Sequence, residues 1–169
     1  MAGVYVVVEH DQGQLAPSAG EALTAARRLS DHLNEPVIAV VIGEATTEFV
    51  SLCEEHGIPK AVSVLDPQIV DYGPELWGQA MAELFSLTEA RVVMATGTDR
   101  GNEILAQASA RAQIPFVANC INAEFSGAWE LTRMQWGGSL LEDVTLDTSS
   151  LSISYAHHSV EAEPLAAAS

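Results

Sequence analysis

The segment best suited to chemistry is the loop 96–101, where an apolar run ends and a helical pattern begins. Open α/β sheets bind ligands where strands end, and the free N–H groups of a helix N-terminus favour an anion. The loop fits neither G-x-G-x-x-G nor G-x-x-x-x-G-K-[ST], and Thr98 or Asp99 would also serve as an N-cap. Helix capping and contact with a ligand or partner both stay open for the candidate residues Thr96, Gly97, Thr98, Asp99, Arg100 and Gly101.

Other polar residues are weaker candidates for a chemical role than the loop 96–101. Glu9 and His10 end the first apolar run, but adjacent residues of a strand point to opposite faces, which favours a local turn over acid–base work. His157 and His158 have no cysteine or third histidine in range, which favours a solvated pair over a metal site. A G-x-S-x-G motif is absent, and neither cysteine has an evident base partner. The sequence predicts no catalytic constellation and no metal site.

Composition and charge exclude further classes of function. The formal net charge of -16 argues against binding to nucleic acid or to anionic membranes, because both require a basic patch. The chain starts without a basic leader and has no apolar stretch long enough to cross a bilayer, so we expect a cytoplasmic location and no membrane insertion. Cys53 and Cys120 are isolated and are predicted to be buried thiols.

Strand and helix patterns alternate over the first two thirds of the chain. Apolar, β-branched runs predict strands, most of them buried on both faces, at 4–8, 37–42, 61–65 and 91–96. Apolar stripes at helical spacing follow each of them, the first after Pro17. Alternation of this kind predicts right-handed crossovers and a parallel sheet.

After Pro115 the pattern changes to successive strands, predicted at 116–125, 129–136, 140–146 and 151–155. We therefore predict a three-layer, Rossmann-like α/β fold with a mostly parallel sheet, helices on both faces and a C-terminal antiparallel hairpin extension. The last strand is expected to close an antiparallel or mixed meander beside the parallel sheet. The predicted domain covers 1–156, and 157–169 is predicted to be a linker-like or frayed tail.

An ordered series of segments resembles the alpha subunits of electron-transfer flavoproteins over nearly the whole chain. The opening Val6-Val7-Val8-Glu9-His10, the first helix and the loop that starts at Thr96 all resemble that family. The segment 131–140 looks like the family's hairpin Arg-Pro-x-Tyr-Gly-Gly, with Met134 in place of proline and Ser139 in place of the following lysine or asparagine. Tyr155-Ala156-His157-His158 replaces the usual arginine and proline after the last strand.

The resemblance implies a heterodimer of alpha and beta subunits that carries FAD and moves electrons from flavin dehydrogenases to an acceptor. The FAD-binding domain is the C-terminal one of the alpha subunit, in cis or as a separate chain, and its motifs are not found in this sequence. AMP is possible in the beta subunit. This domain is then expected to dock the beta-type subunit, without enzymatic activity and without binding FAD alone.

An alternative from another class is a stand-alone adenine-nucleotide-binding module of the universal-stress-protein type. Such modules hold phosphates with a glycine-rich loop followed by serine or threonine. Here Gly101 is followed by Asn102 and Glu103, and the carboxylate of Glu103 would repel a phosphate.

Overall fold

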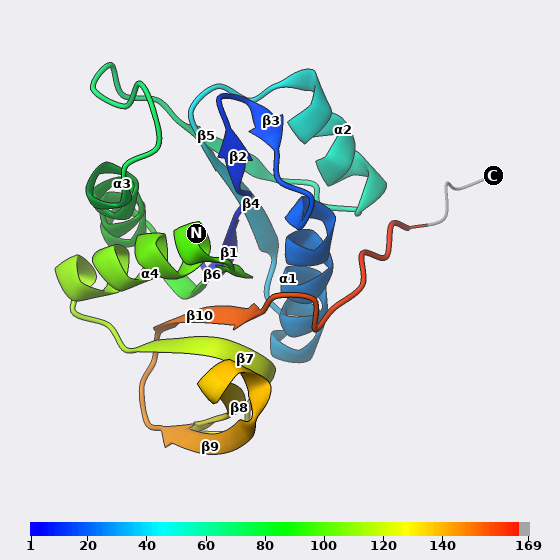
Figure 1. The fold of residues 1–169 in the computed structure, drawn as a ribbon, viewed down its shortest axis with the longest axis vertical. Helices are drawn as coiled ribbons and strands as arrows, with labels where there is room; N and C mark the ends of the chain where they lie inside the picture. Colours follow the sequence, from blue (N-terminus) through cyan, green and yellow to red (C-terminus); the bar gives the residue numbers. More distant parts are fainter. Residues whose placement is uncertain (166–169) are drawn as a thin grey trace.

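The computed structural model describes residues 1–165 and places an eight-stranded sheet at the centre of the fold (Figure 1). The strand order is β5-β4-β1-β6-β10-β7-β8-β9, parallel from β5 to β7 and antiparallel for β8 and β9. This confirms the predicted mostly parallel sheet. The strands are β1 (Gly3–Val7), β4 (Val37–Ile42), β5 (Ala61–Val64), β6 (Ala90–Gly97), β7 (Phe116–Phe125), β8 (Trp129–Gln135), β9 (Leu140–Leu146) and β10 (Leu151–Ala156).

Helices cover both faces of the sheet, with α1 and α2 on one face and α3 and α4 on the other (Figure 1). Side chains alternate along a strand, so Val4 and Val6 of β1 pack with Leu23 of α1, whereas Tyr5 and Val7 join the opposite core. In the described part of the chain, no helix is long and apolar enough to cross a membrane. The helices are α1 (Ala19–Leu33), α2 (Thr47–Glu55), α3 (Pro74–Leu87) and α4 (Asp99–Ala112).

Strand β10 lies inside the sheet, and the expectation that it would close a meander is wrong. It runs parallel between β6 and β7, so that Ile153 pairs with Met94 on one side and with Val117 on the other. All six of its residues are buried, including Ser152 and Ser154. Serine alternating with apolar residues indicates a half-exposed strand when it is considered alone, which explains the error.

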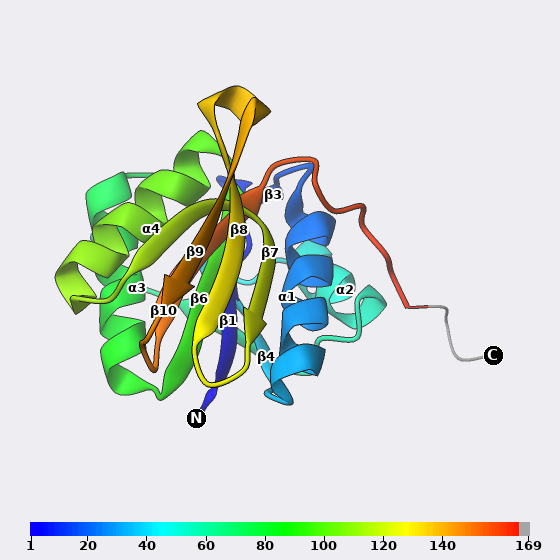
Figure 2. The same cartoon turned by 90° about the horizontal axis from the view of Figure 1, so that it is seen from below.

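Strands β7, β8 and β9 form the predicted antiparallel extension at one edge of the sheet (Figure 2). Trp129 of β8 is 0% exposed and joins the core on the α1 face. Its ring centroid lies 5.3 Å from that of Phe125, over which the Arg91 guanidinium sits at 4.3 Å. The turn between β8 and β9 contains a short 3-10 helix, η1 (Trp136–Gly138), and projects beyond the helices in Figure 2.

The chain after β10 runs over α1 and α2 as far as it is described. The backbone N–H of Glu163 donates to Thr24 Oγ1 at 2.9 Å, and Arg27 donates to the Glu163 carbonyl at 2.8 Å. The backbone N–H of Leu165 donates to the carbonyl of Glu55 at 2.8 Å. The division into a domain at 1–156 and a tail at 157–169 stays a prediction, and residues 166–169 lie outside the described residues.

Cys53 and Cys120 are free and buried. Burial raises the pKa of Cys53 to about 11 and that of Cys120 to about 12. We expect Ellman's reagent at pH 8 to label neither thiol of the native protein and both in denaturant, because the thiolate is the reactive form. The unfolded thiols ionise near pH 9, so the free energy of unfolding should decrease as the pH rises from there through about 11 for Cys53 and about 12 for Cys120. Rapid labelling of the native protein would contradict this burial.

Candidate functional site

The loop 96–101 lies at the carboxyl edge of the sheet, beside its switch point. Strand β1 has β4 on one side and β6 on the other, so the crossovers leave in opposite directions. Thr96 and Gly97 end β6, Thr98 is the N-cap of α4, and the loop then enters the helix. Open α/β sheets bind ligands at this position. Whether the loop is free to bind depends on what its polar groups contact.

Thr98 joins the N-terminus of α4 to the end of β1. Its Oγ1 accepts a hydrogen bond from the backbone N–H of Gly101 at 3.0 Å, which is an N-cap interaction. The same hydroxyl donates to Glu9 Oε2 at 2.6 Å. The carboxylate of Glu9 therefore lies near the helix N-terminus, where the helix dipole favours negative charge. Capping is the role that the geometry gives to Thr98.

Close packing accounts for Gly97 and Gly101. A Cβ atom on Gly97 would lie 2.6 Å from Asn119 Oδ1 and 2.7 Å from the carbonyl oxygen of Tyr155. A Cβ atom on Gly101 would lie 1.9 Å from the carbonyl oxygen of Thr96. These separations are far below van der Waals contact. The two glycines allow neighbouring backbone segments to approach, and no phosphate is needed to explain them.

Arg100 is fixed on the outer side of the loop. Its Nη1 donates to the carbonyl of His10 and to Asp11 Oδ1, both at 3.3 Å, and its guanidinium lies 4.4 Å from the ring centroid of Tyr72. The Tyr72 hydroxyl donates to Glu103 Oε2 at 2.5 Å. Burial, followed by this hydrogen bond, raises the pKa of Tyr72 far above its ordinary value. Sequence reasoning missed Tyr72, because no local motif links the segment before α3 to α4.

A second set of hydrogen bonds ties β10 to β7 and α4. The Ser154 hydroxyl accepts from the Asn119 backbone N–H at 2.8 Å and donates to Asn102 Oδ1 at 2.6 Å. The Tyr155 hydroxyl shares a hydrogen bond with Thr96 Oγ1 at 3.2 Å. Burial is the main cause that raises the pKa of Tyr155. Strand β10 therefore holds the loop 96–101 and the first turns of α4 through hydrogen bonds.

Negative charge prevails around the N-terminus of α4, because the guanidinium of Arg100 is paired with Asp11. The carboxylates of Glu9 and Glu103 accept hydrogen bonds there, and Asp99 lies in the first helical turn. A phosphate placed among these groups would be repelled. The geometry therefore disfavours the adenine-nucleotide module. Contact of the loop residues with a ligand or partner stays a prediction.

His10 holds the turn that follows β1. Strands β2 (His10–Asp11) and β3 (Gln14–Leu15) form a small antiparallel ribbon around this turn, which the sequence did not predict. The backbone N–H of Gly13 donates to His10 Nδ1 at 3.0 Å, so His10 Nε2 carries the proton and donates to the Ile42 carbonyl at 2.7 Å. Both ring nitrogens serve local structure.

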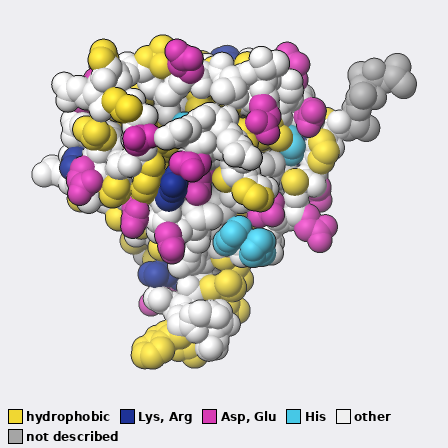
Figure 3. Space-filling view, turned by 45° about the horizontal axis from the view of Figure 1, so that its top comes forward, with side chains coloured by type: hydrophobic (Ala, Val, Ile, Leu, Met, Phe, Trp, Pro, Cys, Tyr) yellow, Lys and Arg dark blue, Asp and Glu magenta, His cyan; other side chains and the backbone are white. Residues whose placement is uncertain are grey.

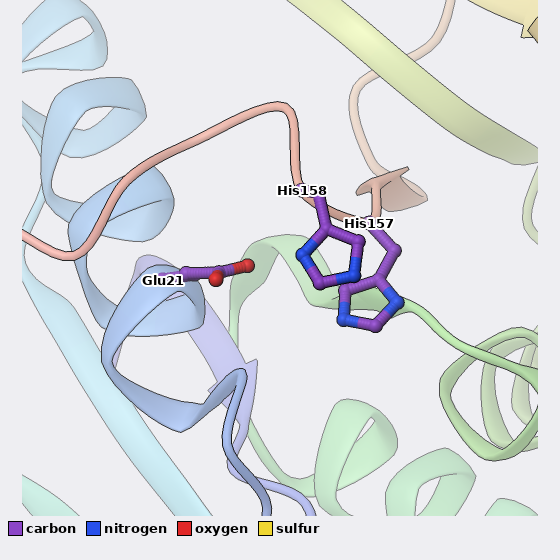
Figure 4. Close-up of side chains that lie close together, drawn as sticks. All are labelled: Glu21, His157 and His158. Carbon is purple, nitrogen blue, oxygen red and sulfur yellow. The ribbon is translucent and has the colours of Figure 1, made fainter.

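The fold places a carboxylate beside the histidine pair at the end of β10. The rings of His157 and His158 stack with their centroids 3.7 Å apart. Glu21, from the first turn of α1, brings a carboxylate oxygen to them, and the three donor atoms lie within 4.8 Å of one another (Figure 4). From the sequence alone, a cysteine or a third histidine nearby is the expected sign of a metal site. A carboxylate from a distant helix carried no local signal.

A pocket of about 320 Å³ lies between α1 and β7. Its charged and polar lining groups are engaged in local contacts. Arg28 pairs with Glu163 at 2.7 Å, and His32 Nε2 accepts from the backbone N–H of Phe125 at 3.2 Å. The carboxylate of Glu124 accepts from Asn122 at 3.3 Å. The pocket therefore offers less for chemistry than the edge of the sheet.

The fold is that of a Rossmann-like α/β domain with an antiparallel extension. At the carboxyl edge of its sheet lies the loop 96–101, whose polar side chains are hydrogen-bonded within the loop and to the end of β1. The chain belongs to the electron transfer flavoprotein domain family, whose model matches residues 4–169. The predicted resemblance to the N-terminal domain of alpha-type subunits is confirmed.

Similar proteins include an electron transfer flavoprotein subunit alpha and two proteins with other names. Protein FixB of Azorhizobium caulinodans is 27% identical over 143 residues, 82% of this chain and 39% of that protein. Electron transfer flavoprotein subunit alpha of Megasphaera elsdenii is 23% identical over 84% of this chain and 43% of its own length. Lactate dehydrogenase (NAD(+),ferredoxin) subunit LctC of Acetobacterium woodii is 21% identical over 87% of this chain and 36% of its own length. The chain thus spans about two fifths of the length of these relatives.

Proposed function

We propose that this domain is the docking and scaffold part of an alpha-type electron-transfer flavoprotein. In this role it binds a beta-type subunit and supports electron transfer by FAD, acting as part of an electron carrier and not as an enzyme. The family membership supports this role, and flavin dehydrogenases would be indirect partners. AMP, if present in the assembly, would belong to the beta-type subunit.

The residues of the sheet-edge loop do not fit the pyrophosphate of FAD. The carboxylates of Glu9, Asp99 and Glu103 surround the helix N-terminus that would otherwise receive it. We therefore expect FAD to be bound by a separate domain, in cis or on another chain, and assign no step of its chemistry to these residues.

The observation that carries the docking proposal is the apolar turn between β8 and β9. Trp136, Leu140 and Leu141, here called the hairpin tip, are 81%, 56% and 63% exposed. Large apolar side chains gathered on a projecting turn are typical of a protein interface, and tryptophan is enriched among residues that dominate binding energy. The extension that carries the tip is anchored in the core by Trp129, at the opposite end of β8. We assign this surface to the beta-type subunit.

Replacing Trp136 with alanine is expected to raise the Kd for a beta-type subunit of the same organism at least tenfold, which corresponds to about 1.4 kcal/mol. The double variant Leu140→Ser, Leu141→Ser should behave similarly. Isothermal titration calorimetry measures the Kd, and circular dichroism checks the fold.

Leu87→Ser is the matched control, since Leu87 is 84% exposed at the end of α3, away from the tip. It should leave the Kd unchanged. If the unmodified chain does not bind the beta-type subunit, the docking role is wrong. If the control weakens binding as much as Trp136→Ala, the role stands but the assignment of the surface does not.

A further inference from the structure

We propose that Glu21, His157 and His158 form a binding site for a divalent transition metal ion such as Zn²⁺. The three side chains come from α1 and from the turn after β10, and they converge in Figure 4. The inference does not depend on the docking function, because the hairpin tip lies on other elements.

The backbone holds both halves of this cluster in place. Ala156 pairs with Gly97 within the sheet, and the turn that follows is closed by two hydrogen bonds from Ser159 to the Ala156 carbonyl, from N at 3.0 Å and from Oγ at 2.6 Å. His158 has a φ of 63°, so the turn includes a left-handed residue. The histidines are therefore presented from a fixed turn, while Glu21 is presented from a helix.

The carboxylate of Glu21 supplies an independent sign of a missing partner. Its Oε2 atom is shielded from solvent and makes no hydrogen bond within the described residues. A buried polar atom without a partner is costly, and such an atom in a native structure calls for an explanation such as an ion. A cation bound between the Glu21 carboxylate and the two histidines would give this carboxylate a partner.

The donor set selects the kind of ion. Two imidazole nitrogens and one carboxylate oxygen suit Zn²⁺ and its transition-metal neighbours, whereas Ca²⁺ requires six to eight oxygen ligands. Three protein ligands leave the fourth position of a tetrahedral Zn²⁺ site open to water or to another ligand. The formal net charge of -16 favours the approach of cations, and Figure 3 shows Asp and Glu side chains scattered over the face that it presents.

Binding requires a small rearrangement that the exposed rings permit. Ligand bonds of about 2.0–2.1 Å place neighbouring donor atoms roughly 3.4 Å apart on tetrahedral Zn²⁺. In the structure the three donor atoms lie within 4.8 Å of one another, so they must move closer. The rings of His157 and His158, now stacked at 20°, must turn so that one nitrogen of each faces the ion. Both side chains are exposed, so no core contact opposes this rotation.

Titration of Zn²⁺ into the metal-free, untagged chain, followed by calorimetry, tests the site. We expect one ion per chain, and Ca²⁺ should give no such binding. His157→Ala, His158→Ala and Glu21→Gln should each raise the Kd for Zn²⁺ at least tenfold. Bound Zn²⁺ should also raise the Tm of the unmodified chain, but not that of His157→Ala.

Glu48→Gln is a matched control, because Glu48 occupies the first turn of α2 as Glu21 does that of α1. His32→Gln controls for loss of a histidine elsewhere. Both should bind Zn²⁺ as the unmodified chain does. The proposal is overturned if the Kd of the unmodified chain exceeds about 1 mM, if Ca²⁺ binds equally, or if any of the three site variants, checked for folding by circular dichroism, binds as tightly as the unmodified chain.

Discussion

Gly101→Ala is expected to lower the free energy of unfolding by about 3 kcal/mol, a cost near the upper end for overpacking. Alanine in a helix normally stabilises by about 0.5–1 kcal/mol over glycine. Here the new Cβ atom would lie 1.9 Å from the carbonyl oxygen of Thr96 and 3.1 Å from Thr98 Oγ1. Relief of this overlap must displace the first turn of α4 from the end of β6, which also disturbs the Thr98 cap. Urea denaturation with linear extrapolation measures the loss.

Gly73→Ala provides the comparison. A Cβ atom on Gly73 meets nothing within 4 Å, and the residue is the N-cap of α3. Its replacement should cost no more than about 1 kcal/mol, the difference in capping preference. Equal losses in the two variants, or a gain in stability for Gly101→Ala, would show that the close approach at the loop is not a constraint.

Trp129→Ala is expected to cost about 3–5 kcal/mol, the range for a fully buried aromatic residue. The side chain is 0% exposed and packs beside Phe125 in the core on the α1 face. Its removal leaves a cavity where the antiparallel extension meets the parallel sheet. Thermal and urea unfolding should show the loss, and the near-ultraviolet circular dichroism should show loosened packing.

Trp136→Ala serves as the control for the same chemical change at the other end of β8. Trp136 is 81% exposed, so truncation should change the free energy of unfolding by no more than about 0.5 kcal/mol. Trp129→Ala thus tests the stability of the fold, whereas Trp136→Ala tests docking. Equal destabilisation by both variants would contradict the anchoring role of Trp129.

The sequence predicted much of the fold because its strand patterns are strong and local. The runs at 37–42, 116–125 and 140–146 coincide with β4, β7 and β9. The place of β10 could not be foreseen, because it depends on pairing with strands far away in the chain and on the buried Ser154, which is hydrogen-bonded to Asn102 and Asn119. The β2–β3 ribbon was missed because two-residue strands carry too little pattern.

The candidate site was predictable in position but not in its contacts. Thr98 was one of two predicted cap residues, with Asp99, since threonine or aspartate before a helical pattern favours that role. Its second partner, Glu9, lies 89 positions earlier and was considered only with its neighbour His10. The sequence shows no sign of Glu21 as a ligand, because its approach to the histidines requires the turn after β10 to pass over α1. Long-range pairing of this kind leaves no trace in local spacing.

The position of β10 also dictates an order of events during synthesis. Until residues 151–156 have left the ribosome, β6 and β7 lack the strand that lies between them, and each presents an unpaired edge. The N-terminal strands can pair early, but the sheet closes only when its last strand inserts at the centre, which is a contact of long sequence separation and therefore slow to form. A nascent chain paused before residue 151 would carry a split sheet, open to chaperones and to unwanted strand pairing.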